Sequence, residues 1–169
     1  MKGHSSLWDN YSASIVETKS DSPLQGNSQP FQELYHVYEK MRLMDEKNGV
    51  YDYSKGGYLV NPTSGLLDSF INNGYIVNKN YKASMPYVIT NENEIIIGKR
   101  NGRRDMPTPH PTLIGGIDPQ VKMAGMLHIE NGKIVSYDDR SGHYRPNKAS
   151  LKYADDAFNK YNYLKKGNE

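Results

Sequence analysis

Hydrophobic residues recur at intervals of three and four in two stretches of the chain, and this spacing predicts an amphipathic helix near each end. The first helix is expected over 31–47, with Ser28 as its cap. The second is expected from Asn147, a residue type that caps helices, to about Leu164. Their apolar stripes hold Phe31, Leu34, Val37, Tyr38, Met41 and Met44 in the first helix and Leu151, Ala154, Phe158 and Tyr161 in the second.

The chain between these helices carries short runs of β-forming residues. A short helix, opened by Pro62 and continuing to Ile71, is expected before most of them. Tyr87–Thr90 and Glu94–Gly98 then flank three polar residues, which predicts a hairpin. We therefore expect an α+β fold, in which an antiparallel β-sheet of about four to six strands is flanked by an N-terminal and a C-terminal helix.

A second hairpin is predicted around Asn131-Gly132, because both residues of a tight two-residue turn take positive φ and Asn-Gly does so readily. The turn would pair Glu130 with Lys133, Ile129 with Ile134 and His128 with Val135. The core face would then hold Leu127, Ile129 and Ile134, and the other face Met126, His128, Val135 and Tyr137. A slip of one residue would exchange the two faces.

Length and composition suit one domain with a modest core. The chain has 169 residues, 36% of them apolar, and a net charge of +2. We expect a flexible leader or linker at 1–30, a single domain at 31–164 and a tail at 165–169. A net charge this small produces no strong field that would attract nucleic acid to the whole surface.

Signals for membranes and export are absent from the sequence. It has no run of about 18 apolar residues, so no membrane partner is expected. The N-terminus has no apolar core of a signal peptide. The absence of cysteine excludes disulfides and thiolate metal sites. The localisation stays open between the cytoplasm and delivery into a target cell by a specialised secretion system.

The segment 141–145 concentrates side chains that can do chemistry. Ser141 and His143 lie two residues apart and would point the same way in an extended segment. His143 can pass a proton near neutral pH, Tyr144 can donate a hydrogen bond or stack on a base, and Arg145 can grip phosphate. The same turn could instead serve only to end the last strand and support the final helix. The sequence leaves both interpretations open.

A second candidate is His110, which lies between Pro109 and Pro111. The three prolines at 107, 109 and 111 are expected to hold this loop extended, because each fixes φ and restricts the residue before it. With His143 it could form an acid–base pair, in which one ring takes the 2′-hydroxyl proton of RNA and the other protonates the leaving oxygen. The alternative is a solvent-facing histidine in a rigid loop.

Basic residues cluster just before this loop. Lys99, Arg100, Arg103 and Arg104 could hold phosphate groups of a substrate, with Arg145 as a further contact, or could form only a solvated turn. No histidine and carboxylate spacing typical of a metal site occurs, so no metal and no cofactor is expected. No Ser–His–Asp order with a nucleophile elbow is visible either.

Several of these segments together resemble a known family. The core of the plant IQ-motif-containing calmodulin-binding proteins and their fungal and bacterial relatives is similar to YVITNENEIIIGKR, HPTLIGG, AGMLHIENGKIVSYDDRSGHYRP and the final helix. The similarity spans 87–158, and its most specific part is the Ser-Gly-His-Tyr-x-Pro element. The matching positions are His110, Gly115, Gly116, Ala124, Gly125, Ser141, Gly142, His143, Tyr144 and Pro146.

The resemblance extends to C-terminal domains of bacterial polymorphic toxins, and it transfers positions rather than catalytic roles. The sequence has no IQ motif, that is, no Ile-Gln followed by spaced basic residues. Calmodulin is therefore not expected as a partner.

Three functional hypotheses follow. The first is a bacterial effector or toxin domain that acts as a metal-independent ribonuclease, with RNA or a nucleotide as substrate and an immunity protein as partner. Its catalytic residues would be Ser141, His143, Tyr144 and His110, and Arg100, Arg104 and Arg145 would bind the substrate. The second is an ADP-ribosyltransferase-like toxin with NAD as substrate, although no catalytic glutamate is evident on a late strand. The third is a non-catalytic protein- or ligand-binding module. An enzyme is favoured, and it requires the two imidazoles to open on one cleft.

Overall fold

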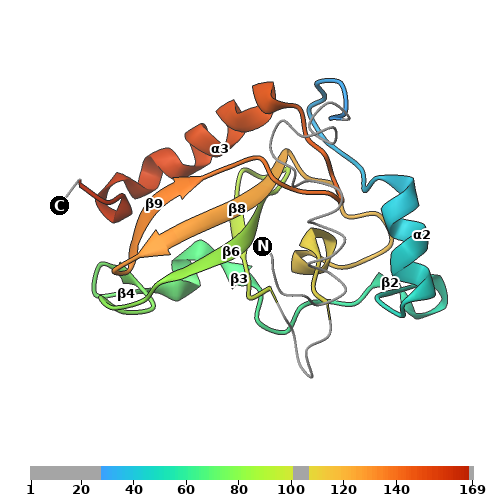
Figure 1. Ribbon diagram of the computed structural model, residues 1–169, viewed down its shortest axis with the longest axis horizontal. Helices are drawn as coiled ribbons and strands as arrows, with labels where there is room; N and C mark the ends of the chain where they lie inside the picture. The colour runs from blue at the N-terminus through green and yellow to red at the C-terminus, as the bar shows by residue number, and fades with distance from the viewer. Residues whose placement is uncertain (1–27, 101–106, 168–169) are drawn as a thin grey trace.

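The computed structural model describes residues 28–100 and 107–167, and over these it has an α+β fold (Figure 1). At its centre is a five-stranded antiparallel sheet with the strand order β3-β7-β6-β8-β9. The strands are β3 (Gly65–Leu66), β6 (Ala83–Ile89), β7 (Ile95–Ile97), β8 (Met123–Glu130) and β9 (Lys133–Tyr137). The predicted fold class and the range for the number of strands are confirmed.

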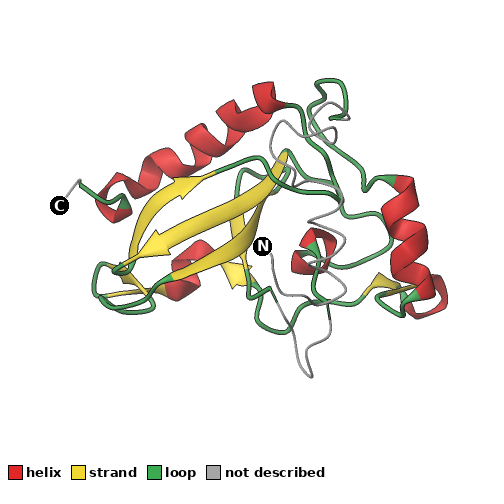
Figure 2. Ribbon diagram, viewed as in Figure 1, coloured by secondary structure: helices red, strands yellow, loops and turns green. Residues whose placement is uncertain are grey.

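A C-terminal helix of 17 residues lies along one face of the sheet (Figure 2). It comprises the 3-10 turn η7 (Lys148–Ser150), α3 (Leu151–Phe158) and the 3-10 helix η8 (Asn159–Leu164). The side chain of Asn147 accepts a hydrogen bond from the Ala149 backbone N–H at 2.9 Å, which confirms the predicted cap. Phe158 stacks on Tyr137 with 4.4 Å between ring centroids and meets Tyr87 edge-on at 5.6 Å. These rings form the centre of the larger core.

The opposite face of the sheet carries a second, smaller core. Val88 on β6 and Ala124 on β8 point to this face, and both are fully buried. They pack with Tyr35, Leu113, Val121 and Tyr144, which come from the loops between the sheet and the N-terminal helix. The sheet is therefore covered on both faces around Val88, and it becomes exposed towards Ser84 at the start of β6.

The N-terminal helix is shorter than its hydrophobic spacing predicts. The helix α2 spans Glu39–Lys47, and Tyr38 rather than Ser28 occupies its N-cap position. The preceding residues are irregular instead of helical, because Tyr35 pairs with Val121 and is completely buried there. Tertiary pairing thus overrides a helical period. Within the described residues no helix is long and apolar enough to cross a membrane.

The expected helix from Pro62 to Ile71 is also wrong for most of its length. Only η4 (Leu67–Phe70) is helical, and it is a 3-10 helix. Gly65 and Leu66 pair with Ile97 and Ile96 as an edge strand of the main sheet, which removes them from any helix. Two small hairpins complete the fold: β1 (Tyr51–Asp52) with β2 (Gly57–Tyr58) around the 3-10 turn η3 (Tyr53–Lys55), and β4 (Ile71–Asn72) with β5 (Tyr75–Ile76).

The β8–β9 hairpin has the predicted turn and a register that shifts midway. Asn131 and Gly132 take φ values of 54° and 71°, and the pairs next to the turn are as predicted. Beyond Ile129 a β-bulge leaves Val135 unpaired, so that His128 faces Ser136 and Leu127 faces Tyr137. The predicted His128–Val135 pair is therefore wrong. Tyr137 consequently points into the larger core instead of away from it.

Candidate functional site

His110 lies inside the molecule rather than on a surface loop. The segment expected to be extended turns at this point into η6 (His110–Leu113), a 3-10 helix with Pro111 in its first turn. The imidazole is 1% exposed, and its Nε2 donates a hydrogen bond to the Gly125 carbonyl at 2.8 Å. Burial lowers the pKa of His110 to about 4, and the nearby His143 acts in the same direction. His110 is thus a neutral, buried residue near neutral pH.

His143 has no exposed surface and holds two distant parts of the chain together. Its Nε2 lies 2.8 Å from Asp45 Oδ2, and Asp45 is itself completely buried on α2. The Tyr58 hydroxyl donates to the same carboxylate oxygen at 2.6 Å. The His143 carbonyl also accepts a hydrogen bond from the Tyr38 backbone N–H at 2.6 Å. These contacts give His143 a structural role, because they fix the start of α2 against the turn after β9.

The neighbouring candidate residues form further contacts that hold the same turn in place. The Ser141 hydroxyl accepts a hydrogen bond from the Tyr144 backbone N–H, and the buried Tyr144 phenol donates to the Pro119 carbonyl at 2.6 Å. Arg145 takes a positive φ of 46° and lays its guanidinium over the Tyr38 ring at 3.8 Å. Its Nε donates to the Gly142 carbonyl.

The predicted phosphate-binding loop is only partly described. Arg104 lies outside the described residues. Arg100 is half-buried, and its carbonyl accepts a hydrogen bond from the Thr108 hydroxyl. Binding of phosphate by Arg100, Arg104 and Arg145 stays a prediction.

The structure thus brings His110 and His143 close together but seals both rings in the interior. The open cleft that the ribonuclease hypothesis requires of these two rings is therefore contradicted. The physical reason is that the proline-rich segment turns into η6, which packs against the sheet through Leu113 and the His110–Gly125 hydrogen bond. A substrate cannot reach either imidazole without local unfolding.

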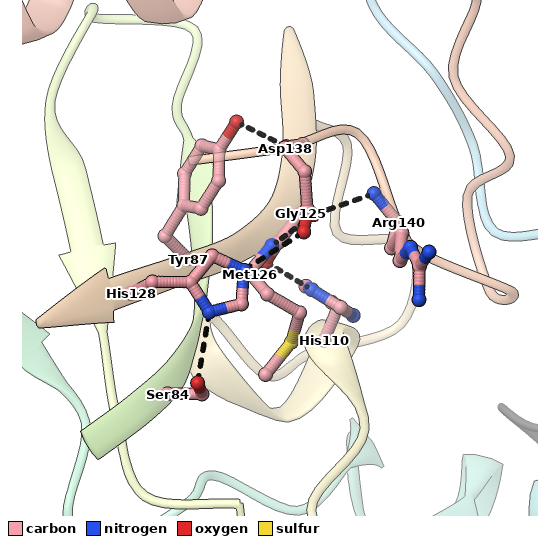
Figure 3. Close-up of polar contacts among 8 residues, drawn as sticks. All are labelled: Ser84, Tyr87, His110, Gly125, Met126, His128, Asp138 and Arg140. Carbon is pink, nitrogen blue, oxygen red and sulfur yellow. Dashed lines mark hydrogen bonds and ion pairs between the residues drawn. The ribbon is translucent and has the colours of Figure 1, made fainter. Parts of the chain in front are cut away.

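A different group of polar side chains lies at the exposed end of the same sheet. Ser84 on β6 and His128 on β8 are direct cross-strand partners, and Asp138 follows β9 (Figure 3). The Ser84 hydroxyl lies 2.8 Å from His128 Nδ1, and His128 Nε2 lies 3.0 Å from Asp138 Oδ2. Ser84 is exposed, and the His128 side chain is 37% exposed. We name these three residues the relay.

The β-sheet register explains why the first two relay residues meet. The Met126 carbonyl accepts a hydrogen bond from the Asp138 backbone N–H, so the backbone polar groups of Met126 point towards β9. Those of His128, two residues further along β8, point the same way. The Ser84–His128 pair is therefore a non-hydrogen-bonded pair of the β6–β8 ladder. Cα atoms in such pairs are only about 4.5 Å apart, which brings the side chains into contact.

The hydrogen bonds also define the proton on His128. An ionised carboxylate only accepts hydrogen bonds, so His128 Nε2 carries the proton that Asp138 receives. In the neutral imidazole Nδ1 is then an acceptor, and the Ser84 hydroxyl donates to it. This is the tautomer in which an imidazole can remove the serine proton.

Asp138 is held in place by backbone groups. Its second carboxylate oxygen, Oδ1, accepts hydrogen bonds from the Met126 N–H at 2.8 Å and the Arg140 N–H at 2.9 Å. The buried Tyr87 phenol donates to the Asp138 carbonyl at 2.8 Å. Gly125 allows this close approach, because a Cβ at that position would lie 1.8 Å from the Asp138 carbonyl oxygen. The acid of the relay is therefore well ordered.

The relay has the parts of a nucleophilic site: a hydroxyl, an imidazole that can take its proton, and a fixed carboxylate that orients the imidazole. It differs from the serine-protease arrangement, in which the serine meets Nε2 and the aspartate meets Nδ1. Both imidazole nitrogens can accept a proton, so the reversal leaves the acid–base chemistry intact. In the described part of the chain, no group of three or more histidine and carboxylate side chains is arranged to hold a metal ion.

Sequence reasoning missed the relay as a unit. The hairpin pattern placed His128 on the face opposite the core, but nothing in the sequence singled out Ser84. Positions 84 and 128 are separated by 44 residues and become neighbours only through the β6–β8 pairing. The available signal was one polar residue near the start of β6 and another near the end of β8, two otherwise mainly apolar strands. Such residues usually indicate only a solvated strand end.

Comparison of the chain with protein-family models, with curated proteins and with solved structures finds no match. The resemblance described above therefore stays a prediction.

Proposed function

We propose that this protein is a hydrolase of carboxylic esters, in which Ser84 is the nucleophile, His128 the general base and acid, and Asp138 the residue that orients the imidazole. The observation that carries the proposal is the unbroken chain of two hydrogen bonds from the exposed Ser84 hydroxyl through His128 to Asp138. The proposal keeps the effector or toxin role expected from the sequence and replaces RNA cleavage as its reaction.

The reaction proceeds in two steps. The Ser84 Oγ forms a bond to the ester carbonyl carbon while its proton passes to His128 Nδ1. The carbon–oxygen bond to the leaving alcohol then breaks, and the alcohol takes the proton from His128. In the second step the oxygen of water bonds to the acyl carbon while its proton passes to His128. The bond between the acyl carbon and Ser84 Oγ then breaks, and Oγ takes the proton back from His128 as the carboxylic acid leaves.

The test combines covalent labelling with turnover of the full chain. A fluorophosphonate probe should add one phosphonyl group to wild-type protein at Ser84, detected by intact mass and peptide mapping. S84A and H128Q should lower the rate of p-nitrophenyl butyrate hydrolysis by at least about 100-fold, because they remove the nucleophile and its base. S136A is the matched control, because Ser136 flanks His128 on the opposite strand, is exposed, and has no place in the relay.

Expression in bacteria separates this proposal from the alternatives. Growth arrest by wild type but not by S84A, with RNA intact, supports an ester-hydrolysing toxin. Arrest by both proteins with RNA degraded would point back to a ribonuclease. Labelling of S84A at the level of wild type would overturn the assignment of the nucleophile.

A non-catalytic binding module is the second candidate. It is favoured by the contacts of Ser141, His143 and Tyr144, which are all buried and bonded within the fold. Under this function neither the probe nor the ester would react with wild-type protein, and expression would be harmless.

A further inference from the structure

A cavity of about 330 Å³ lies on the side of the molecule that carries α2, away from the residues of the relay. Its walls come from the start of α2, from the β1–β2 hairpin and from the loop at 117–118. A volume near 300 Å³ is at the lower end of the range for small-molecule sites in proteins. A ligand of this size has few atoms, so recognition must rest on a small number of polar contacts.

The aromatic wall of the cavity is rigid. Tyr51 and Tyr58 meet edge-to-face with 4.8 Å between ring centroids, and both are almost fully buried. The Tyr51 hydroxyl donates to the Ile117 carbonyl at 3.1 Å, and the Tyr58 hydroxyl donates to Asp45. Since Asp45 is also hydrogen-bonded to His143, the Ser-Gly-His-Tyr turn supports this wall through Asp45. Val37 adds an apolar surface.

Charged groups of both signs line the same cavity. Glu39 and Asp118 contribute carboxylates, and Arg42 contributes a guanidinium that lies 5.3 Å from the centroid of the Tyr51 ring. Arg42 is 4.0 Å from Glu39, and Asp118 lies 2.9 Å from His36 Nδ1. The His36–Asp118 pair is about half exposed, and in the other pair Glu39 is mostly exposed, so both pairs are weak and a ligand can replace them at low cost.

We propose that this cavity binds a free α-amino acid with an apolar side chain. The two carboxylates match the ligand ammonium group, and Arg42 matches its carboxylate through paired hydrogen bonds. Val37, Ile117 and the accessible edges of the tyrosine rings match its side chain. A ligand with both charges uses all three kinds of surface, whereas a simple amine or a simple acid uses only two. This site is independent of the proposed ester hydrolysis.

The test uses three probes of similar size: L-phenylalanine, phenethylamine, which lacks the carboxylate, and 3-phenylpropionate, which lacks the ammonium. Calorimetric titration of the full chain should give a dissociation constant for L-phenylalanine at least about tenfold below those of the other two, because each lost charged hydrogen bond weakens binding by that order. S84A should bind it like wild type.

Variants locate the site. R42Q and the double variant E39Q/D118N should each weaken L-phenylalanine binding by about tenfold or more. E46Q is the matched control, because Glu46 also contacts Arg42, at 3.4 Å, but does not line the cavity. Equal affinity for phenethylamine would overturn recognition of the amino acid in favour of a site for amines. No binding of any probe at millimolar concentration, or binding unchanged in R42Q and E39Q/D118N, would overturn the site itself.

Discussion

At the scale of single residues, three of the histidines that the structure describes differ in their environment. His110 and His143 are buried and bonded to the fold, whereas His128 is exposed and bonded to groups that could react. An imidazole can exchange protons with a substrate only where the substrate can reach it. Exposure, more than residue type, therefore separates the structural histidines from the candidate catalytic one.

The burial of His110 predicts a dependence of stability on pH. Its pKa is about 4 in the folded protein and near 6.5 when exposed, so between these values the unfolded chain binds more protons than the native one. The contribution of neutral His110 to the free energy of unfolding is therefore fully present above pH 6.5. It is lost as the pH falls towards 4, by roughly 3 kcal/mol in total. The measurement is the free energy of urea unfolding of wild type and H110Q at several pH values from 7.5 to 4.

H110Q removes the titrating group but keeps, in the place of the imidazole Nε2, a hydrogen-bond donor for the Gly125 carbonyl. The comparison is between the slopes against pH, so a general loss of stability in the variant does not affect it. Identical slopes for the two proteins would contradict the assignment of His110 as the buried neutral base.

At the scale of elements, the β8–β9 hairpin shows how far a local pattern reaches. Asn131-Gly132 predicted the turn and the two pairs beside it, because that geometry depends only on φ at two residues. The bulge at Val135 was not predictable from the pattern. The bulge depends on packing in the core, since it lets Tyr137 stack on Phe158 there and leaves Val135 at the surface.

Gly125 provides a test of how closely this hairpin and the Asp138 backbone must approach. In G125A the added Cβ would overlap the Asp138 carbonyl oxygen, which is backbone and cannot rotate away. We expect a loss of unfolding free energy of about 3 kcal/mol or more, together with loss of ester hydrolysis, because Asp138 must move. Urea denaturation and the p-nitrophenyl butyrate assay measure the two effects.

S136A, on the neighbouring strand, should change stability by less than about 0.5 kcal/mol, because it removes only an exposed side chain. A stable G125A protein with wild-type activity would show that the strands can separate at Gly125 without consequence, contrary to this account.

At the scale of the whole molecule, a few long-range contacts join the two sides of the fold. The His143–Asp45 pair spans 98 positions in sequence and connects the turn after β9 with α2. Tyr35 contributes another link, since its hydroxyl lies 2.6 Å from the Ser150 hydroxyl at the start of the C-terminal helix. The segment carrying α2 is therefore tied to the rest of the fold by buried polar contacts as well as by the apolar packing of Tyr35 against Val88.

Removal of one partner of the His143–Asp45 pair should destabilise the whole molecule. H143A leaves the Asp45 carboxylate buried with Tyr58 as its remaining partner, and breaking a buried pair in this way costs about 3–5 kcal/mol. H36A is the control, because the His36–Asp118 pair is exposed and should contribute less than about 1 kcal/mol. Thermal and urea unfolding would measure both, and an H143A protein as stable as H36A would refute the structural role of His143.

The sequence by itself determined the features that depend on neighbouring residues: the α+β class, the Asn-Gly turn, the cap at Asn147 and the apolar stripe of the C-terminal helix. These follow from backbone preferences and from the period of side chains along one element. Tertiary structure decided the rest. It kept 31–38 out of the helix, buried His110 and His143, and placed Ser84 beside His128, because each of these outcomes depends on contacts between segments that are distant in sequence.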